Sequence, residues 1–319
     1  MRGGLSALLT LAATMAAGQP VLDLPVDCTP GESCTIQNFV DHVPGPEAGD
    51  FRCGPLSYDG HKGTDFALPT LREMQEGVQV LAAATGVVRG IRDGMEDRRF
   101  EPADQDAIAG RDCGNGVVIA HEDGWETQYC HMKRGSLRVK TGDTVQAGTV
   151  LGEIGLSGRT QFPHLHLSVR HQDRVVDPFA PSGATTCGEA GETLWKAPPV
   201  YVPGALLSVG FSDHVPDYED IQAGTAARET VPLDAAGLVL FGYAFGGQTG
   251  DILRLTINGP EGAFLSEEFA LEKEQARFFR AAGRRLTTAR WPAGQYRGEV
   301  AMLRDGTVIS RKTVEITVK

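Results

Sequence analysis

Histidine side chains gather in three short segments of this sequence. His61 stands in DGHKGTDFALP, His131 in TQYCHMK, and His164 and His166 in FPHLHLSVR, while Asp65 follows His61 four positions later. Imidazole nitrogen and carboxylate oxygen are both good ligands for zinc, and a catalytic zinc site usually takes three protein ligands and keeps a fourth position open. The residue types therefore point to metal-assisted chemistry.

The spacing decides whether these side chains can meet. Side chains alternate between the faces of a strand, so His164 and His166 share one face and Leu165 points to the other. The spacing of His61 and Asp65 suits one face of a helix, but Gly60 and Gly63 favour a loop. Each motif alone is weak, because an isolated buried histidine is more often simply hydrogen-bonded in a core. Their combination is what indicates a shared site.

The elements that must position these residues are predicted to be strands. Short apolar runs punctuated by glycine continue from about residue 55 to 181, and this pattern is typical of β-rich folds. The predicted strands are 78–82, 86–91, 116–120, 125–130, 144–154 and 164–170. The charged segment 93–112 lacks apolar periodicity and is predicted to be a surface insertion at the rim of the site.

A second unit follows in the last third of the chain. The length of 319 residues exceeds one ordinary domain of about 100–200 residues. The segment 182–204 is rich in Ala, Pro and Gly and is predicted to be a linker, and residues 205–319 are predicted to form a small β-sandwich of immunoglobulin-like type. Its predicted strands are 237–245, 251–258, 294–303 and 307–318. This unit has no cysteine and no histidine cluster, so we expect it to bind or to space rather than to catalyse.

The N-terminal sequence predicts export. Residues 1–18 carry one positive charge ahead of a Leu- and Ala-rich run that ends in small residues, as a signal peptide does, and a Cys- and Pro-rich lead-in occupies 19–54. We expect cleavage to release a protein without a membrane span into the periplasm or the exterior.

Six cysteines in an exported chain predict disulfides rather than a cysteine zinc site, because no C-x-x-C pair occurs. The short loop Cys28–Cys34 is the favoured pair, and the other pairings stay open. The net charge of −11 and the pI near 5.2 argue against a nucleic-acid partner.

The motifs together resemble the lysostaphin and LytM family of zinc endopeptidases, which carry H-x-x-x-D, an intermediate histidine and H-x-H in this order. The resemblance spans about residues 54–180 and includes GVQVLAAATGVV, GNGVVIAH and TGDTVQAGTVLGEIGLSG. It implies an all-β chain whose first domain, 55–181, is a sandwiched antiparallel sheet. It also implies one zinc ion held by His61, Asp65 and His166, with His131 and His164 as catalytic histidines.

Ser168 and Tyr58 lie near these motifs in the sequence and also bear on the chemistry of the site. Many members of the family carry an acidic or amide residue where this chain has Ser168, so we expect a different hydrogen bond around the metal. Tyr58 is either a hydrogen-bond donor to the developing oxyanion or a buried structural residue.

The resemblance also implies a function. The family cuts peptide bonds in bacterial cell-wall cross-links, so an exported peptidoglycan endopeptidase is the leading hypothesis. The alternatives are a catalytically silent wall-binding regulator and a secreted protease acting on glycine-rich protein. A cupin-type metal site is disfavoured, because Arg170 and His171 stand where such a site needs a carboxylate. The C-terminal unit is expected to bind wall polymer or a protein, or to position the first domain, and the oligomeric state is left open.

Overall fold

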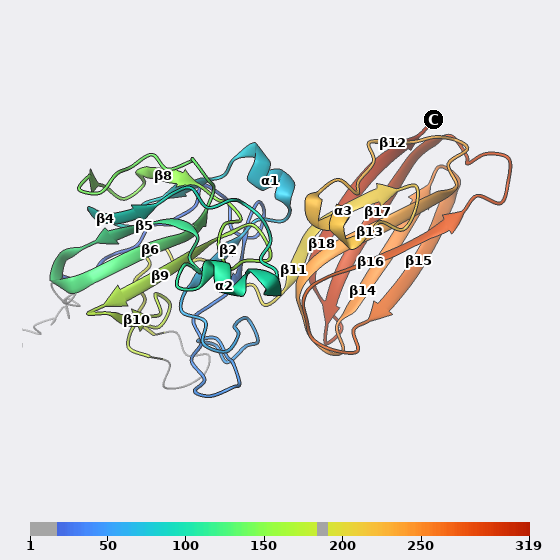
Figure 1. The fold of residues 1–319 in the computed structure, drawn as a ribbon. Helices are drawn as coiled ribbons and strands as arrows, with labels where there is room; N and C mark the ends of the chain where they lie inside the picture. The colour runs from blue at the N-terminus through green and yellow to red at the C-terminus, as the bar shows by residue number, and fades with distance from the viewer. Residues whose placement is uncertain (1–17, 184–190) are drawn as a thin grey trace, which may run out of the picture.

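The structure is a computed structural model that describes residues 18–183 and 191–319. The predicted signal peptide, apart from Gly18, and Cys187 lie outside the described residues. Two β-rich units follow each other along the chain, one drawn in blue to green and the other in yellow to red (Figure 1). The expected all-β architecture, with a sheet-based first domain and a second β domain, is confirmed.

The first unit is built on an antiparallel sheet with the order β1-β2-β9-β6-β5-β4-β7, and β10 also pairs with β9. Its strands are β1 Thr35–Asn38, β2 Thr64–Ala67, β4 Gly86–Arg92, β5 Asn115–Ala120, β6 Trp125–Met132, β7 Thr144–Val145, β9 His164–His171 and β10 Arg174–Val176. A second, small sheet pairs β3 Gln79–Leu81 with β8 Val150–Glu153. The short helices of this unit are α1 Leu71–Glu76, η1 Pro102–Asp104, α2 Gln105–Ile108 and η2 Glu122–Gly124.

Two local expectations for this unit are wrong. The strand predicted over 144–154 is two strands in different sheets, because the chain turns at Gly148, whose φ of 83° is readily adopted by glycine alone. The loop expected around His61 and Asp65 ends early, because Thr64 starts β2 and Asp65 is therefore a strand residue. The short β2 is paired on both sides, by β1 and β9, which explains why a weak local pattern still forms a strand.

The strand register brings distant residues together. Asp65 on β2 is directly opposite His166 on β9, and Cys130 on β6 is opposite His166 from the other side. Directly opposed residues of an antiparallel pair have Cβ atoms only about 4.5–5.5 Å apart. The register therefore joins the first and last motifs at the centre of the sheet.

Disulfides fasten two parts of this unit. Cys28 and Cys34 are bonded, as expected, and Cys113 is bonded to Cys130. The second bond ties the segment before β5 to the end of β6, next to His131.

The C-terminal unit, which is described throughout residues 191–319, consists of two sheets. One has the order β11-β13-β16 and the other β12-β18-β17-β14-β15. The bounds are β11 Ala205–Ser212, α3 Tyr218–Ala223, β12 Thr230–Val231, β13 Gly237–Gly247, β14 Ile252–Gly259, β15 Gly262–Ala270, β16 Gln275–Arg285, β17 Gly294–Arg304 and β18 Thr307–Val318. The four predicted strands are confirmed, whereas β11, β12, β15 and β16 were not predicted. In β15 the largely exposed residues hide the alternation.

The two units share an apolar core. Phe241, Tyr243 and Phe245 of β13 belong to the same buried cluster as Phe66 and Leu68 of the first unit. Leu194 and Trp195, in the segment expected to link the units, are also buried in that cluster. The C-terminal unit is thus packed onto the first unit rather than joined to it by a linker alone.

Candidate metal centre

Three side chains converge at the centre of the main sheet. The distance from His61 Nε2 to His166 Nδ1 is 3.1 Å, and Asp65 Oδ1 lies 3.2 Å from the first atom and 2.8 Å from the second. His61 and Asp65 are buried and His166 is nearly so. The structure thus brings together the three residues expected to bind metal.

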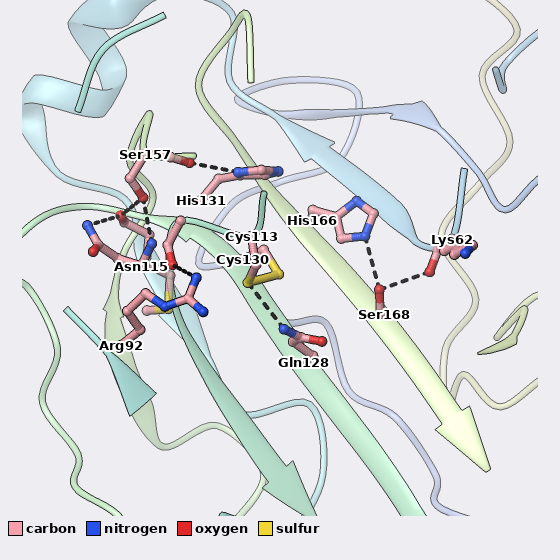
Figure 2. The surroundings of a disulfide bond; sticks show 12 residues. Lys62, Arg92, Cys113, Asn115, Gln128, Cys130, His131, Ser157, His166 and Ser168 are labelled. Atoms are coloured by element: carbon pink, nitrogen blue, oxygen red, sulfur yellow. Dashed lines mark hydrogen bonds between the residues drawn. A yellow bond between two sulfur atoms is a disulfide. The ribbon is translucent and has the colours of Figure 1, made fainter. Parts of the chain in front are cut away.

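The hydrogen bonds behind the two imidazoles fix their tautomers. His61 Nδ1 lies 2.6 Å from the carbonyl oxygen of Phe39, which can only accept, so Nδ1 carries the proton and Nε2 keeps its lone pair. His166 Nε2 lies 3.0 Å from the hydroxyl of Ser168, which donates to the carbonyl of Lys62 at 2.9 Å. Ser168 therefore accepts from Nε2–H and leaves the lone pair on Nδ1, as Figure 2 allows the reader to follow.

Ser168 thus supplies the outer hydrogen bond whose identity the sequence left open. Partners of this kind orient a ligating histidine and raise its basicity. The third candidate ligand is oriented in the same way, since Asn38 donates its amide Nδ2–H to Asp65 Oδ2 at 2.8 Å and leaves Oδ1 facing the centre. Asn38 was missed from the sequence, because it lies on β1 in the lead-in and no motif marks it.

The donor set fits zinc. The anchors aim one nitrogen lone pair of each ring and a carboxylate oxygen at the same point, where a cation can lie among them. Zinc bonds of about 2.0–2.2 Å at tetrahedral angles separate ligand atoms by about 3.3 Å, close to the separations found here. Burial alone would raise the pKa of Asp65, but the electrostatic effect of the neighbouring His61 and His164 holds it well below its usual range. The carboxylate is therefore charged and ready to bind a cation.

His131 and His164 form a pair beside this centre. Their ring centroids are 4.7 Å apart, and His164 Nε2 lies 3.4 Å from Asp65 Oδ1. His131 Nδ1–H donates to the carbonyl of Ser157 at 2.8 Å, and His164 Nδ1–H donates to the carbonyl of Phe162 at 2.9 Å. Both rings are thus anchored through Nδ1 and keep Nε2 for other partners. Burial and the adjacent His164 and His166 hold the pKa of His131 well below its usual range, so its ring is neutral.

The backbone at His131 has an unusual conformation. Its φ of 61° is in the left-handed region, which costs a residue other than glycine about 1–2 kcal/mol. A register shift in the pairing of β5 with β6 lies here, the His131 N–H donates to the carbonyl of Cys113, and Cys113 is bonded to Cys130 (Figure 2). The bulge and the disulfide together hold His131 toward the centre, as bulges near active sites often do.

A cleft of about 630 Å³ opens over the pair and the carboxylate, lined among others by Asp65, His131 and His164. Phe100, from the segment predicted as an insertion, forms part of the wall, and its N–H donates to the carbonyl of Thr160 at 2.9 Å. Tyr58 also lines the cleft and is 53% exposed, so it is not a buried structural residue. The predicted insertion therefore does lie at the rim of the site.

Comparison with known proteins agrees with this geometry. Residues 59–178 match Peptidase family M23. The DD-carboxypeptidase/endopeptidase Mpg of Neisseria meningitidis serogroup B is 32% identical over 122 residues, which cover 38% of this chain and 22% of that protein. The peptidoglycan DD-endopeptidase ShyC of Vibrio cholerae is 30% identical over 139 residues, covering 42% of this chain and 26% of that protein.

Among solved structures, the catalytic domain of the prophage-encoded M23 protein EnpA from Enterococcus faecalis aligns with 54% of this chain and 100% of its own, at 23% identity and a TM-score of 0.33. The chain spans about a quarter of the length of the two relatives named above. The match covers the whole set of converging side chains, from His61 to His166. The domain that residues 59–178 form in this chain belongs to peptidase family M23.

Proposed function

We propose that the protein is an exported zinc metalloendopeptidase that hydrolyses peptide bonds in peptidoglycan cross-links. The observation that carries this proposal is the convergence of His61 Nε2, Asp65 Oδ1 and His166 Nδ1 beside a neutral, buried histidine, His131, that lines a cleft. The names of two relatives, both endopeptidases and one a peptidoglycan DD-endopeptidase, support the choice of substrate.

The residues of the site divide into metal ligands and residues that transfer protons. His61, Asp65 and His166 would hold one zinc ion, which when bound polarises the scissile carbonyl and lowers the pKa of water toward about 7. The anchoring bonds of His61 and His166 leave each ring a single free nitrogen, so the rings need no reorientation when the ion binds. The ligand set is therefore preorganised.

His131 and His164 would move protons at Nε2. Their Nδ1–H groups are committed to backbone carbonyls, so only Nε2 can take a proton from the attacking water or return one to the leaving amine. Both also line the cleft, within reach of a substrate peptide. Tyr58, which also lines the cleft, can donate its O–H to the oxygen that gains negative charge.

Disulfides and the substrate class support an exported protein. The bonds Cys28–Cys34 and Cys113–Cys130 form and persist in oxidising compartments such as the periplasm or the exterior. Among the described residues, no helix is both long and apolar enough to cross a membrane. Peptidoglycan would be met in that same compartment.

The test is digestion of purified peptidoglycan by the zinc-loaded protein, with and without a chelator, followed by mass analysis of the released muropeptides. We expect new peptide termini only when zinc is present. A glycine-rich peptide in a parallel reaction tests the alternative substrate. Absence of cleavage of either substrate by fully zinc-loaded protein would instead support a catalytically silent regulator.

A further inference from the structure

Arg277 reaches from the C-terminal unit onto the first unit. It lies on β16, and its guanidinium donates to the side-chain oxygen of Gln37 and, at 3.2 Å, to the carbonyl of Leu68. Its Cζ atom lies 4.1 Å from the centroid of the Phe162 ring. A single side chain of one unit thus contacts three separate segments of the other.

Each of these segments leads to the metal centre or the histidine pair, either directly or through a residue that orients it. Gln37 precedes Asn38, which orients Asp65, and Leu68 follows the end of β2, the strand that contains Asp65. The connection to His164 is the most direct. The Phe162 ring stacks on the His164 ring at 4.5 Å between centroids, and the Phe162 carbonyl accepts the His164 Nδ1–H.

Contacts within the C-terminal unit hold Arg277 in position for its contact with Phe162. Its Nη1 lies 3.5 Å from the hydroxyl of Tyr243, and its carbonyl accepts a hydrogen bond from Tyr218. No ion pair involves Arg277 in the part of the chain that the structure describes, so its charge is directed at a ring and at neutral oxygens. A planar guanidinium can stack on a ring through its face while donating hydrogen bonds from its edge, which a lysine ammonium cannot do.

We propose that Arg277 is a positioning residue for His164, and that through it the C-terminal unit completes the peptidase site. The order of contact is Arg277 on Phe162, and Phe162 on His164. This inference rests on the proposed function for the role of His164, but the contact itself does not. A displacement of about 1 Å at a reacting group can reduce the rate by about a hundredfold, so loss of the stack should affect turnover more than substrate binding.

The kinetic test uses the full-length, zinc-loaded protein and a soluble muropeptide substrate. For Arg277→Met we expect kcat to fall roughly ten- to a hundredfold, with KM and zinc content nearly unchanged. Arg284→Met is the matched control, because Arg284 is on the same strand but lies over Phe264, away from the first unit. Its kcat should equal that of the wild type. A folded Arg277→Met protein with wild-type kcat would overturn the proposal.

A second measurement does not depend on activity. The ring resonances of His164, assigned by their loss in His164→Gln, should shift in Arg277→Met and also in Phe162→Leu, which removes the ring while leaving Arg277 in place. The resonances of His121, which is hydrogen-bonded to Thr85 and Thr127 elsewhere in the sheet, should not move. Unchanged His164 signals in both variants would refute the coupling even in a protein without peptidase activity. If wild-type protein fails to cleave any substrate but the shifts occur, the proposed function fails and the positioning contact stands.

Discussion

The metal-facing group, which consists of His61, Asp65 and His166, and the pair formed by His131 and His164 both contain two histidines. The two groups differ in where the free nitrogens of these histidines point. His61 and His166 direct their unprotonated nitrogens toward each other and toward Asp65. His131 and His164 lie beside that group and line the cleft. In both groups each ring has one nitrogen fixed by a hydrogen bond to a backbone carbonyl or to Ser168, and the other nitrogen is free. Every ring is thus held by a hydrogen bond behind it, and the position of its free nitrogen, rather than the residue type, separates the two groups.

The two histidines of HLH make this clear. They share one face of β9 and stand two positions apart, yet His164 is anchored through Nδ1 and His166 through Nε2. The anchor of His164 is a carbonyl just before the strand, whereas the anchor of His166 is the side chain of Ser168, the next residue on the same face. His164 therefore presents its Nε2 and His166 its Nδ1, although both rings lie on the same face of one strand.

Removal of a ring from the metal-facing group should have the largest effect. His166→Ala takes away one of three candidate ligands and leaves His61 and Asp65 without the third donor, so we expect zinc content to fall from about one per chain to near zero and activity to be lost. Metal analysis after dialysis against a zinc buffer measures this. A His166→Ala protein that keeps one zinc would refute the division between the two groups.

Removal of a ring from the pair should spare the metal. For His131→Ala we expect unchanged zinc content and a kcat lower by about 10²–10⁴-fold, the usual contribution of a positioned acid or base. His131→Asn is a useful second variant, because asparagine tolerates the left-handed backbone found at this position. Loss of zinc from both variants would place His131 among the ligands instead.

Removal of the hydrogen bond that anchors His166 should have a smaller effect on zinc binding. Ser168→Ala removes the acceptor of the Nε2–H, and we expect zinc affinity to weaken about 10–100-fold while saturating zinc restores kcat. Ser136→Ala is the matched control, since that hydroxyl is hydrogen-bonded to Lys133 and Glu153, outside the centre. Competition with a chromogenic chelator gives both affinities. Equal affinities in the two variants would show that Ser168 does not act on the metal.

The sequence predicted the residues of the site itself better than the residues that orient them. Alternation along a strand correctly placed His164 and His166 on one face, and the family resemblance supplied the set of five residues that the structure brings together. Local patterns are enough to find these five residues, because each motif is short and includes the side chains that carry the chemistry.

The supporting residues could not be found in this way. Asn38 meets Asp65 only because β1 pairs with β2, and this pairing is set by the register of two strands separated by a long loop. Arg277 is 115 positions after Phe162, and its contact depends on the packing of one unit on the other. Such contacts are tertiary, and neither hydrophobic alternation nor residue spacing encodes them.

The smallest effect is expected at the secondary anchor of the pair. Nδ1 of His164 lies 3.2 Å from the Thr160 hydroxyl as well as 2.9 Å from the Phe162 carbonyl, to which that hydroxyl donates at 2.8 Å. Thr160→Val therefore removes one of the two acceptors of His164 and one donor to the other, and it preserves the shape of the side chain. A single neutral hydrogen bond contributes about 0.5–1.5 kcal/mol, which corresponds to a decrease in kcat of roughly two- to tenfold. Zinc content should not change, because Thr160 does not contact the metal-facing group. Steady-state kinetics with metal analysis on the same sample measures both quantities. A decrease as large as that of His131→Ala would mean that the hydroxyl, rather than the backbone carbonyl, holds the ring.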